Sequence, residues 1–230
     1  MLLFRNLKPK IISNPRSYNE NYALEYLNKR KISYNQDKNF FENLFQHYNI
    51  NISNEIILDL ASGVGMDLKI LNEFNPKKLI WHDKMLGVYK IAKINLQGIK
   101  NIEFNLQDIM DLNLYPHNSI KFAMCRDSLC YICNDFLFFQ QINQLLKPDG
   151  FFWGINVNLN WYKKNQQKLS LIKKLRGLYF DWPLYKLTGL RIFSFTPVDA
   201  NRLKYIFKKL NFSILYFKED ETFLEFLIKK

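Results

Sequence analysis

Short apolar runs alternate with segments of helical periodicity along most of this chain. The first run, 55–60, is almost continuously apolar, which is typical of a strand buried on both faces. Alternating strands and helices predict a parallel sheet with helices on both faces. The predicted strands are 55–60, 78–82, 101–105, 120–125 and 151–157, and the predicted helices are 66–75, 85–96, 135–146 and 197–210.

The alternation breaks at both ends of the chain. Residues 1–50 are mainly helical in pattern, and the runs 212–217 and 223–228 flank the acidic turn Glu219-Asp220-Glu221, which predicts a closing hairpin. We therefore expect an α/β fold: a doubly wound, mostly parallel seven-stranded sheet (Rossmann-like). An antiparallel C-terminal strand, a helical N-terminal extension and a helical insertion after the fifth strand complete it. Turn chemistry further predicts a turn over Lys-Pro-Asp-Gly at 147–150, and Thr196 as the N-cap of the last helix.

The first predicted strand leads into a glycine-containing turn, Asp59-Leu60-Ala61-Ser62-Gly63-Val64-Gly65. In doubly wound sheets, ligands bind beyond the carboxyl ends of the strands. Gly63 and Gly65 let the backbone turn sharply and approach a ligand closely. The start of the next helix offers N–H groups suited to a carboxylate or phosphate.

Acidic residues follow three successive predicted strand ends. Besides Asp59, Asp83 follows the second strand, 18 residues after Gly65, and Asp108 follows the third. A carboxylate after the second strand can accept hydrogen bonds from ribose hydroxyls. For each acid taken alone, a solvated loop position or a helix cap is the alternative.

The stretch 56–156 resembles the class I S-adenosylmethionine-dependent methyltransferases, particularly the small-molecule group. Leu58-Asp59-Leu60-Ala61-Ser62-Gly63-Val64-Gly65 is similar to the first motif of that family, and Leu145-Leu146-Lys147-Pro148-Asp149-Gly150-Phe151 is similar to its turn before strand five. The resemblance implies S-adenosyl-L-methionine as the cofactor. Its methionine part would lie against Asp59, Ala61, Ser62, Gly63 and Gly65, its ribose against Asp83, and its adenine against Asp108 and the Ile109 backbone. Further expected cofactor contacts are Lys84, Arg126 and Tyr22.

Two positions depart from the family pattern. Ala61 replaces the usual first glycine, a change that costs little if the backbone there has a negative φ. Lys121 stands where the family often has Asp, and the sequence assigns it no role. A nicotinamide-dependent dehydrogenase is the alternative fold relative, but Leu68 occupies the place of the third glycine in Gly-x-Gly-x-x-Gly.

Methyl transfer is an in-line displacement, so positioning and exclusion of water carry much of the catalysis. A base is needed only where the acceptor holds an awkward proton. Asp127 and Tyr131, just after the fourth strand, are the expected catalytic contacts with the acceptor; each could instead cap a helix or pack. The chain lacks Asn-Pro-Pro-Tyr, Asp-Pro-Pro-Tyr and Pro-Cys, the signatures of base-methylating enzymes.

We expect no metal site. Cys125, Cys130 and Cys133 have part of an iron–sulfur spacing but lack a fourth cysteine, so small buried side chains are the favoured interpretation. His47, His82 and His117 are scattered, as surface or packed histidines are.

The charge excess of +12 is confined to two segments. Residues 1–31 hold seven basic and two acidic residues, and residues 158–192 hold eight basic and one acidic. Such segments can favour nucleic acid, anionic lipid or an acidic small substrate, or serve solubility alone. A basic amphipathic helix within 158–192 would be a lid or a peripheral membrane patch. Tyr18, Tyr22 and Tyr26 share a helical face, and would cover the cofactor or fasten the helix to the sheet.

Together these features predict a single methyltransferase domain over residues 1–230. Its parts are a helical extension (1–50), a cofactor-binding half (51–157), a basic insertion or lid (158–192) and a C-terminal helix with hairpin (193–230). No apolar run approaches the roughly 20 residues that span a bilayer, so we expect a cytoplasmic enzyme. We expect a small-molecule acceptor, anionic or aromatic, methylated at O or N. The alternatives are RNA or another anionic macromolecule as substrate, or a non-catalytic binding protein.

Overall fold

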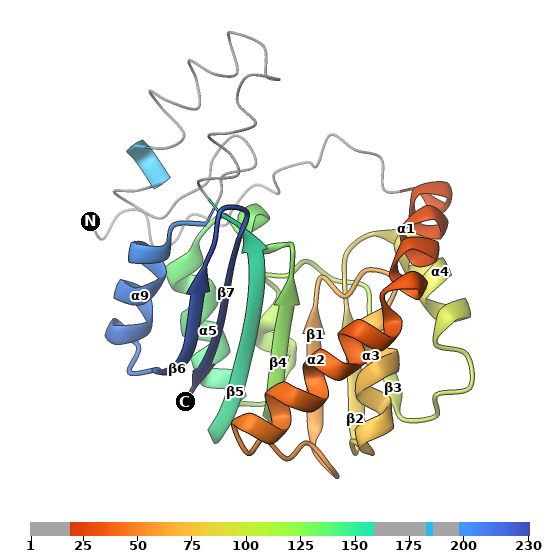
Figure 1. Ribbon diagram of the computed structural model, residues 1–230, viewed down its shortest axis with the longest axis horizontal. Helices are drawn as coiled ribbons and strands as arrows, with labels where there is room; N and C mark the ends of the chain where they lie inside the picture. The colour runs from red at the N-terminus through yellow and green to blue at the C-terminus, as the bar shows by residue number, and fades with distance from the viewer. Residues whose placement is uncertain (1–18, 159–182, 186–197) are drawn as a thin grey trace, which may run out of the picture. The chain divides into compact units, whose positions relative to one another are not determined.

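The computed structural model describes residues 19–158, 183–185 and 198–230. Its strands form one seven-stranded sheet in the order β3-β2-β1-β4-β5-β7-β6 (Figure 1). This order, with antiparallel strands at the C-terminal end, confirms the predicted fold class. The strands are β1 (Ile56–Leu60), β2 (Lys78–His82), β3 (Ile102–Asn105), β4 (Ile120–Arg126), β5 (Leu146–Val157), β6 (Ser213–Glu219) and β7 (Phe223–Lys229). The helices are α1 (Glu20–Ile32), α2 (Tyr34–His47), α3 (Met66–Leu71), α4 (Leu86–Asn95), α5 (Asp135–Leu145) and α9 (Ala200–Lys209), with 3₁₀ turns η1 (Asn72–Phe74), η2 (Leu112–Leu114) and η3 (Leu129–Tyr131).

The chain divides into two compact units, which we describe separately. The described part of the first unit comprises residues 19–125 and 145–152. In it β1 pairs in parallel with both β2 and β4, and β2 pairs in parallel with β3. The last residue of β1, Leu60, lies opposite His82 and Cys125, and His82 lies opposite Asn105. The carboxyl ends of these strands therefore align at one edge.

The core of the first unit explains the continuous apolar runs. Every residue from Ile57 to Leu60 is buried, as are those of β4 up to Cys125. Helices α2 and α3 contact each other (Figure 1), and α2 packs Phe45 edge-on against Phe122 of β4, with ring centroids 5.2 Å apart. Strands covered in this way need apolar residues on both faces.

Lys121 has a structural partner in this unit. Its ammonium donates to the Asp149 carbonyl at 3.2 Å and pairs with the Asp149 carboxylate. It also lies 5.4 Å from the ring centroid of Phe151. Lys121, for which the sequence suggested no role, therefore ties the start of β4 to the start of β5.

The predicted turn at 147–150 is included within β5, which begins directly after α5. The chain nevertheless bends there. A Cβ on Gly150 would stand 3.0 Å from both the backbone N and O of Lys147. Residues three apart in an extended strand are much farther from each other than this. The Lys-Pro-Asp-Gly sequence thus bends the strand, and Gly150 is required for the close approach.

The described part of the second unit comprises residues 126–144, 153–158, 183–185 and 198–230. Strands β6 and β7 pair antiparallel, as the hairpin pattern predicts. Phe139, Phe207 and Phe226 pack together in its core, and Gly154 leaves the space that the Phe226 ring fills. Arg202 forms a two-pronged ion pair with the buried Asp135, which joins the first turns of α9 and α5.

The predicted start of the last helix is wrong. Helix α9 begins at Ala200, and the Asp199 side chain accepts a hydrogen bond from Arg202 N at 2.7 Å. Asp199 is thus the N-cap, in place of Thr196, which lies outside the described residues. Both residue types cap helices well, so sequence alone does not choose between them.

Several predictions concern parts of the chain that the structure does not describe. Tyr18 and nearly all of the basic segment 158–192, including its amphipathic helix, lie outside the described residues. Within the described ranges, no helix has the length and apolar character needed to cross a membrane. The division into one domain with a lid stays a prediction.

Candidate functional site

The loop after β1 adopts an unusual backbone conformation. Ala61, Gly63 and Gly65 all have positive φ, at 53°, 56° and 73°. The condition under which an alanine would cost little, a negative φ at position 61, is therefore not met. Left-handed backbone strains a residue with a Cβ, and such strain is found most often at functional sites. The sequence could not show this, because nothing in the motif distinguishes a tolerated alanine from a strained one.

The end of β2 holds this loop in place. Trp81 Nε1 donates to the Gly63 carbonyl at 2.8 Å, and Ser62 N donates to the His82 carbonyl at 3.2 Å. Gly63 N in turn donates to Asp83 Oδ2 at 3.0 Å. The predicted loop residues and the predicted acid of the second strand therefore lie together.

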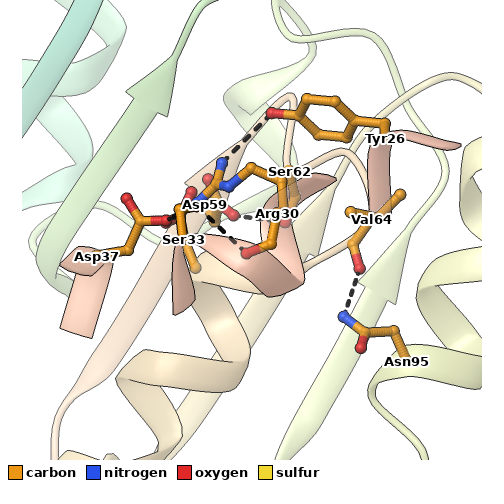
Figure 2. A network of polar contacts seen from close by, with 9 residues as sticks. Tyr26, Arg30, Ser33, Asp37, Asp59, Ser62, Val64 and Asn95 are labelled. Carbon is orange, nitrogen blue, oxygen red and sulfur yellow. Dashed lines mark hydrogen bonds and ion pairs between the residues drawn. The ribbon is translucent and has the colours of Figure 1, made fainter. Parts of the chain in front are cut away.

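Asp59 and Gly65 complete the loop. Asp59 is buried within β1 and accepts a 2.6 Å hydrogen bond from Ser62 Oγ (Figure 2). Asn95 of α4 donates to the Val64 carbonyl at 2.9 Å. At Gly65 a Cβ would collide with the buried Leu96 side chain, which would have to shift to admit it.

Asp83 and Asp108 leave their strands in the same local geometry. Asp83 Oδ1 accepts from Met85 N at 2.9 Å, and Asp108 Oδ1 accepts from Met110 N at 3.0 Å. Each carboxylate thus receives the backbone N–H two residues ahead, a turn that Asp favours. Burial raises the pKa of Asp83 above its ordinary value, although the N–H groups of Met85 and Gly63 oppose that rise.

Lys84, which directly follows Asp83 in the chain, pairs with Asp108. Its ammonium lies 3.0 Å from Asp108 Oδ2, and both side chains are partly exposed. Ile109 follows Asp108 and is half-buried. The structure therefore brings the predicted residues after β2 and β3 together at one edge of the sheet.

Helix α1 adds a polar network that the sequence analysis missed (Figure 2). Arg30 Nη2 pairs with Asp67 of α3 at 2.8 Å and with Asp37 of α2 at 3.2 Å. Arg30 Nη1 also donates to Tyr26 Oη at 3.3 Å. The sequence indicated only that Arg30 lies on the same face of α1 as the tyrosines, because Arg30 continues their four-residue spacing.

Tyr22 and Tyr26 stack on that same face of α1. Their ring centroids are 6.4 Å apart and the rings are nearly parallel. Tyr26 Cε1 lies 3.8 Å from the position that a Cβ on Gly63 would occupy. Tyr26, one of the three tyrosines considered for covering the cofactor or fastening the helix, therefore lies against the glycine loop.

Arg126, Asp127 and Tyr131 belong to the second unit. The Arg126 guanidinium lies 5.0 Å from the Trp153 ring centroid. Asp127 has a positive φ of 57°, and its N–H donates to the Ile155 carbonyl at 2.8 Å. Tyr131 is the last residue of η3, and its N–H donates to the Ser128 carbonyl. Their assignment to cofactor and acceptor stays a prediction.

The cysteines and His82 are packed side chains. Cys125, Cys130 and Cys133 are buried free thiols, and His82 is fully buried. In the parts of the chain that the structure describes, no three His, Cys, Asp or Glu side chains are grouped so as to hold a metal ion.

Comparison with known proteins bears on this arrangement. A family model described as a methyltransferase domain matches residues 51–209. No curated protein matches the sequence. Among solved structures the chain is similar to an S-adenosylmethionine-dependent methyltransferase from Mesorhizobium loti (14% identity over 78% of this chain and 93% of that one, TM-score 0.61). It is also similar to one from Methanosarcina mazei (19%, 80% and 95%, TM-score 0.60). A protein from Methanococcus maripaludis assigned to the same class gives 15% identity, 94% and 95% coverage, and a TM-score of 0.63.

At such low sequence identities, the solved structures support the fold alone. The family model matches most of the chain and therefore shows the family. The strand order 3-2-1-4-5-7-6, the glycine loop after β1 and the acids after β2 and β3 agree with that match. The chain belongs to the methyltransferase domain family, with the fold of the class I S-adenosylmethionine-dependent enzymes.

Proposed function

We propose that this enzyme binds S-adenosyl-L-methionine at the edge formed by the ends of β1, β2 and β3. The enzyme would then transfer the methyl group to an O or N atom of an anionic or aromatic small molecule. The observation that carries the proposal is the shared hydrogen bond between Gly63 N and Asp83, beside the Lys84–Asp108 pair. These two contacts together involve the residues expected to bind the methionine part, the ribose and the adenine, all in one unit.

The residues present fit that cofactor. Each Asp83 oxygen already accepts one backbone N–H, and a carboxylate oxygen has a second lone pair that a ribose hydroxyl can use. The absence of a Cβ on Gly63 allows close approach of a ligand. The carboxylates of Asp59 and Asp83 suit a ligand whose sulfonium and amino groups are positive, and tyrosine faces also attract cations.

The protein's contribution to the chemistry would be orientation. When bound, the cofactor supplies an electrophilic methyl group on sulfur. The loop 61–65 would hold the methionine part, and Asp83 would fix the ribose, so that the methyl group is presented in one direction. Asp127 and Tyr131 are our proposed contacts with the acceptor, either of which could orient it or take its proton.

Calorimetric titration with S-adenosylmethionine and with its demethylated product tests the cofactor site. We expect both to bind the wild-type protein, and Asp83→Ala to weaken both by at least about tenfold, since hydrogen bonds to charged groups contribute about 1.5–3 kcal/mol. The exposed Asp111 provides the control, because Asp111→Ala removes a nearby carboxylate that we do not place in the site. Unchanged affinity in Asp83→Ala would remove Asp83 from the ribose site.

The acceptor role of Asp127 needs a variant that preserves the backbone. Asn tolerates left-handed φ as Asp does, so Asp127→Asn removes the charge while keeping the conformation at φ 57°. With an acceptor found by screening anionic and aromatic small molecules, we expect kcat to fall while cofactor affinity is retained. Full activity in Asp127→Asn would exclude a carboxylate base at this position.

A second proposal keeps the reaction and changes the substrate to RNA. It is motivated by the confinement of the positive charge to residues 1–31 and 158–192. RNA binding of this kind should weaken steeply as salt rises, because neutralised phosphates release counterions. No detectable RNA binding at low salt would exclude it.

A further inference from the structure

His82 stands at the end of β2, immediately before Asp83, and its side chain is fully buried. Its imidazole is held at both nitrogens. Nδ1 lies 2.6 Å from Tyr115 Oη, and Nε2 lies 2.8 Å from the carbonyl oxygen of Asp108. The ring therefore bridges the loop after β3 and the segment that precedes β4.

The partners fix where the proton on the ring must be. A carbonyl oxygen can only accept, so Nε2 carries the hydrogen and donates it to Asp108. In a neutral imidazole Nδ1 then accepts, and Tyr115 is its donor. Tyr115 Oη in turn accepts from Asn105 Nδ2 at 3.1 Å, so the chain of hydrogen bonds has one consistent direction.

The Asp108 carbonyl receives a second hydrogen bond, from Asp111 N at 2.8 Å. A carbonyl oxygen has two lone pairs, and both are used here. The peptide plane between Asp108 and Ile109 is thereby fixed in orientation. Since a trans peptide directs its N–H opposite to its C=O, the ring of His82 also sets the direction of the Ile109 N–H.

In our proposal the Asp108 carboxylate and the Ile109 N–H are the two groups that face the adenine. The amino group of adenine donates and its neighbouring ring nitrogen accepts, so a carboxylate paired with a backbone N–H is complementary to that edge of the base. The Asp108 carboxylate is held by Met110 N and Lys84. The peptide that carries the Ile109 N–H is held instead by the hydrogen bond from His82 Nε2 to the Asp108 carbonyl.

We propose that His82 is a positioning residue for base recognition: by donating to the Asp108 carbonyl, it directs the Ile109 N–H toward the adenine edge of the cofactor, beside the Asp108 carboxylate. This inference rests on the proposed cofactor site. His82 touches no part of the ligand in this scheme and acts through the Asp108–Ile109 peptide. Its own carbonyl accepts from Ser62 N, so one residue connects the loop after β1 with the loop after β3.

The burial of the ring agrees with this role. Burial lowers the pKa of His82 below its ordinary value, although the hydrogen bond to Asp108 opposes the change. Burial also raises the pKa of Tyr115. The neutral ring that the hydrogen bonds require is therefore the form that the site favours.

Base discrimination provides a readout that a purely structural role would not change. The probes are S-adenosylhomocysteine and its 6-oxo analogue, in which an oxygen replaces the amino group and the adjacent ring nitrogen carries a hydrogen. This analogue reverses both the donor and the acceptor. Calorimetric dissociation constants for the two give a discrimination ratio, which we expect to be at least about tenfold for the wild-type protein.

The variants are His82→Leu, which removes both ring hydrogen bonds, and His82→Gln, whose amide can still donate toward Asp108. Tyr115→Phe is the matched control, because it removes the partner of Nδ1 and leaves the bond to Asp108 in place. We expect the ratio to fall below about threefold in His82→Leu and to persist in His82→Gln and Tyr115→Phe. The conservative variant keeps the test usable if His82→Leu does not fold.

The outcomes separate the two proposals. If the wild-type protein binds neither probe, the proposed cofactor site itself is wrong. If the wild-type protein discriminates and both His82 variants keep the full ratio, the positioning role is wrong. An equal loss of discrimination in Tyr115→Phe and His82→Leu would point to general packing and would overturn the inference as well.

Discussion

The guanidinium of Arg30 and the carboxylate of Asp67 meet at 2.8 Å, although 37 residues separate them in the sequence. Their side chains are only 12% and 7% exposed. The pair fastens α1 to the first turn of α3, which directly follows the glycine loop. Tyr26, which also contacts Arg30, lies against Gly63. One cation thus joins α1 to α2 and to the helix that follows the glycine loop.

Replacing Arg30 by Met should therefore weaken both stability and cofactor binding. Breaking a buried ion pair leaves an uncompensated charge, so we expect a loss of about 3 kcal/mol in the free energy of unfolding, measured with urea. Lys38→Met is the control, because the Lys38–Glu73 pair is partly exposed and joins α2 to η1. The loss in Lys38→Met should be much smaller than in Arg30→Met, because exposed ion pairs contribute little to stability. Equal losses in the two variants would contradict a special role for Arg30.

Ala61→Gly should stabilise the protein. Left-handed backbone costs a residue with a Cβ about 1–2 kcal/mol, part of which the flexibility of glycine in the unfolded chain offsets. We expect a net gain of about 0.5–1 kcal/mol in thermal or urea unfolding. Ala123→Gly in the buried strand β4 is the control and should destabilise. A loss of stability in Ala61→Gly would mean that the methyl group contributes more than its strain costs.

Gly65→Ala and Gly98→Ala separate the cost of backbone strain from the cost of a steric clash. Both glycines have positive φ, but a Cβ on Gly65 meets Leu96, whereas one on Gly98 meets nothing within 4 Å. We expect Gly98→Ala to cost about 1 kcal/mol from strain alone and Gly65→Ala to cost about 1–3 kcal/mol more from overpacking. Urea unfolding of the two variants measures the difference. Similar costs would show that Leu96 moves aside freely.

Stability at alkaline pH should depend on Tyr34. Burial and the hydrogen bond to Glu73 raise the pKa of Tyr34 from 10.0 to about 12. Between these values the folded protein keeps a proton that the unfolded chain has lost, so the free energy of unfolding falls as pH rises. Tyr34→Phe should flatten this fall between about pH 10 and 12 relative to wild type. The same substitution at the exposed Tyr205 is the control, and identical curves for wild type and Tyr34→Phe would refute the prediction.

Sequence reasoning worked where local pattern and sheet topology decide the structure. The apolar runs of β1 and β4 are buried on both faces, and that burial is what the pattern reports. Asp83 and Asp108 could be placed together because parallel strands end at one edge. The antiparallel pairing of β6 and β7 followed from the acidic turn between two apolar runs.

Sequence-based prediction failed where contacts between distant residues, or backbone strain, determine the structure. Arg30 lies in a helix whose pattern gives no hint of Asp67, since the pair forms only after tertiary folding. The positive φ of Ala61 depends on how β2 holds the loop, which no local preference encodes. Likewise, the Lys-Pro-Asp-Gly sequence does bend the chain, but the bend lies within the strand β5, where Lys121 contacts Asp149.

Three consecutive residues, the last two of β2 and the one after it, each hold the glycine loop: Trp81 by its indole, His82 by its carbonyl and Asp83 by its carboxylate. Inserting one residue into β2 would turn every following side chain to the opposite face of the sheet. All three contacts would be lost together. Gly98, in the exposed turn after α4, has open space around it. Homologues and engineered variants should therefore differ in length near Gly98, while the spacing from Trp81 to Asp83 stays fixed.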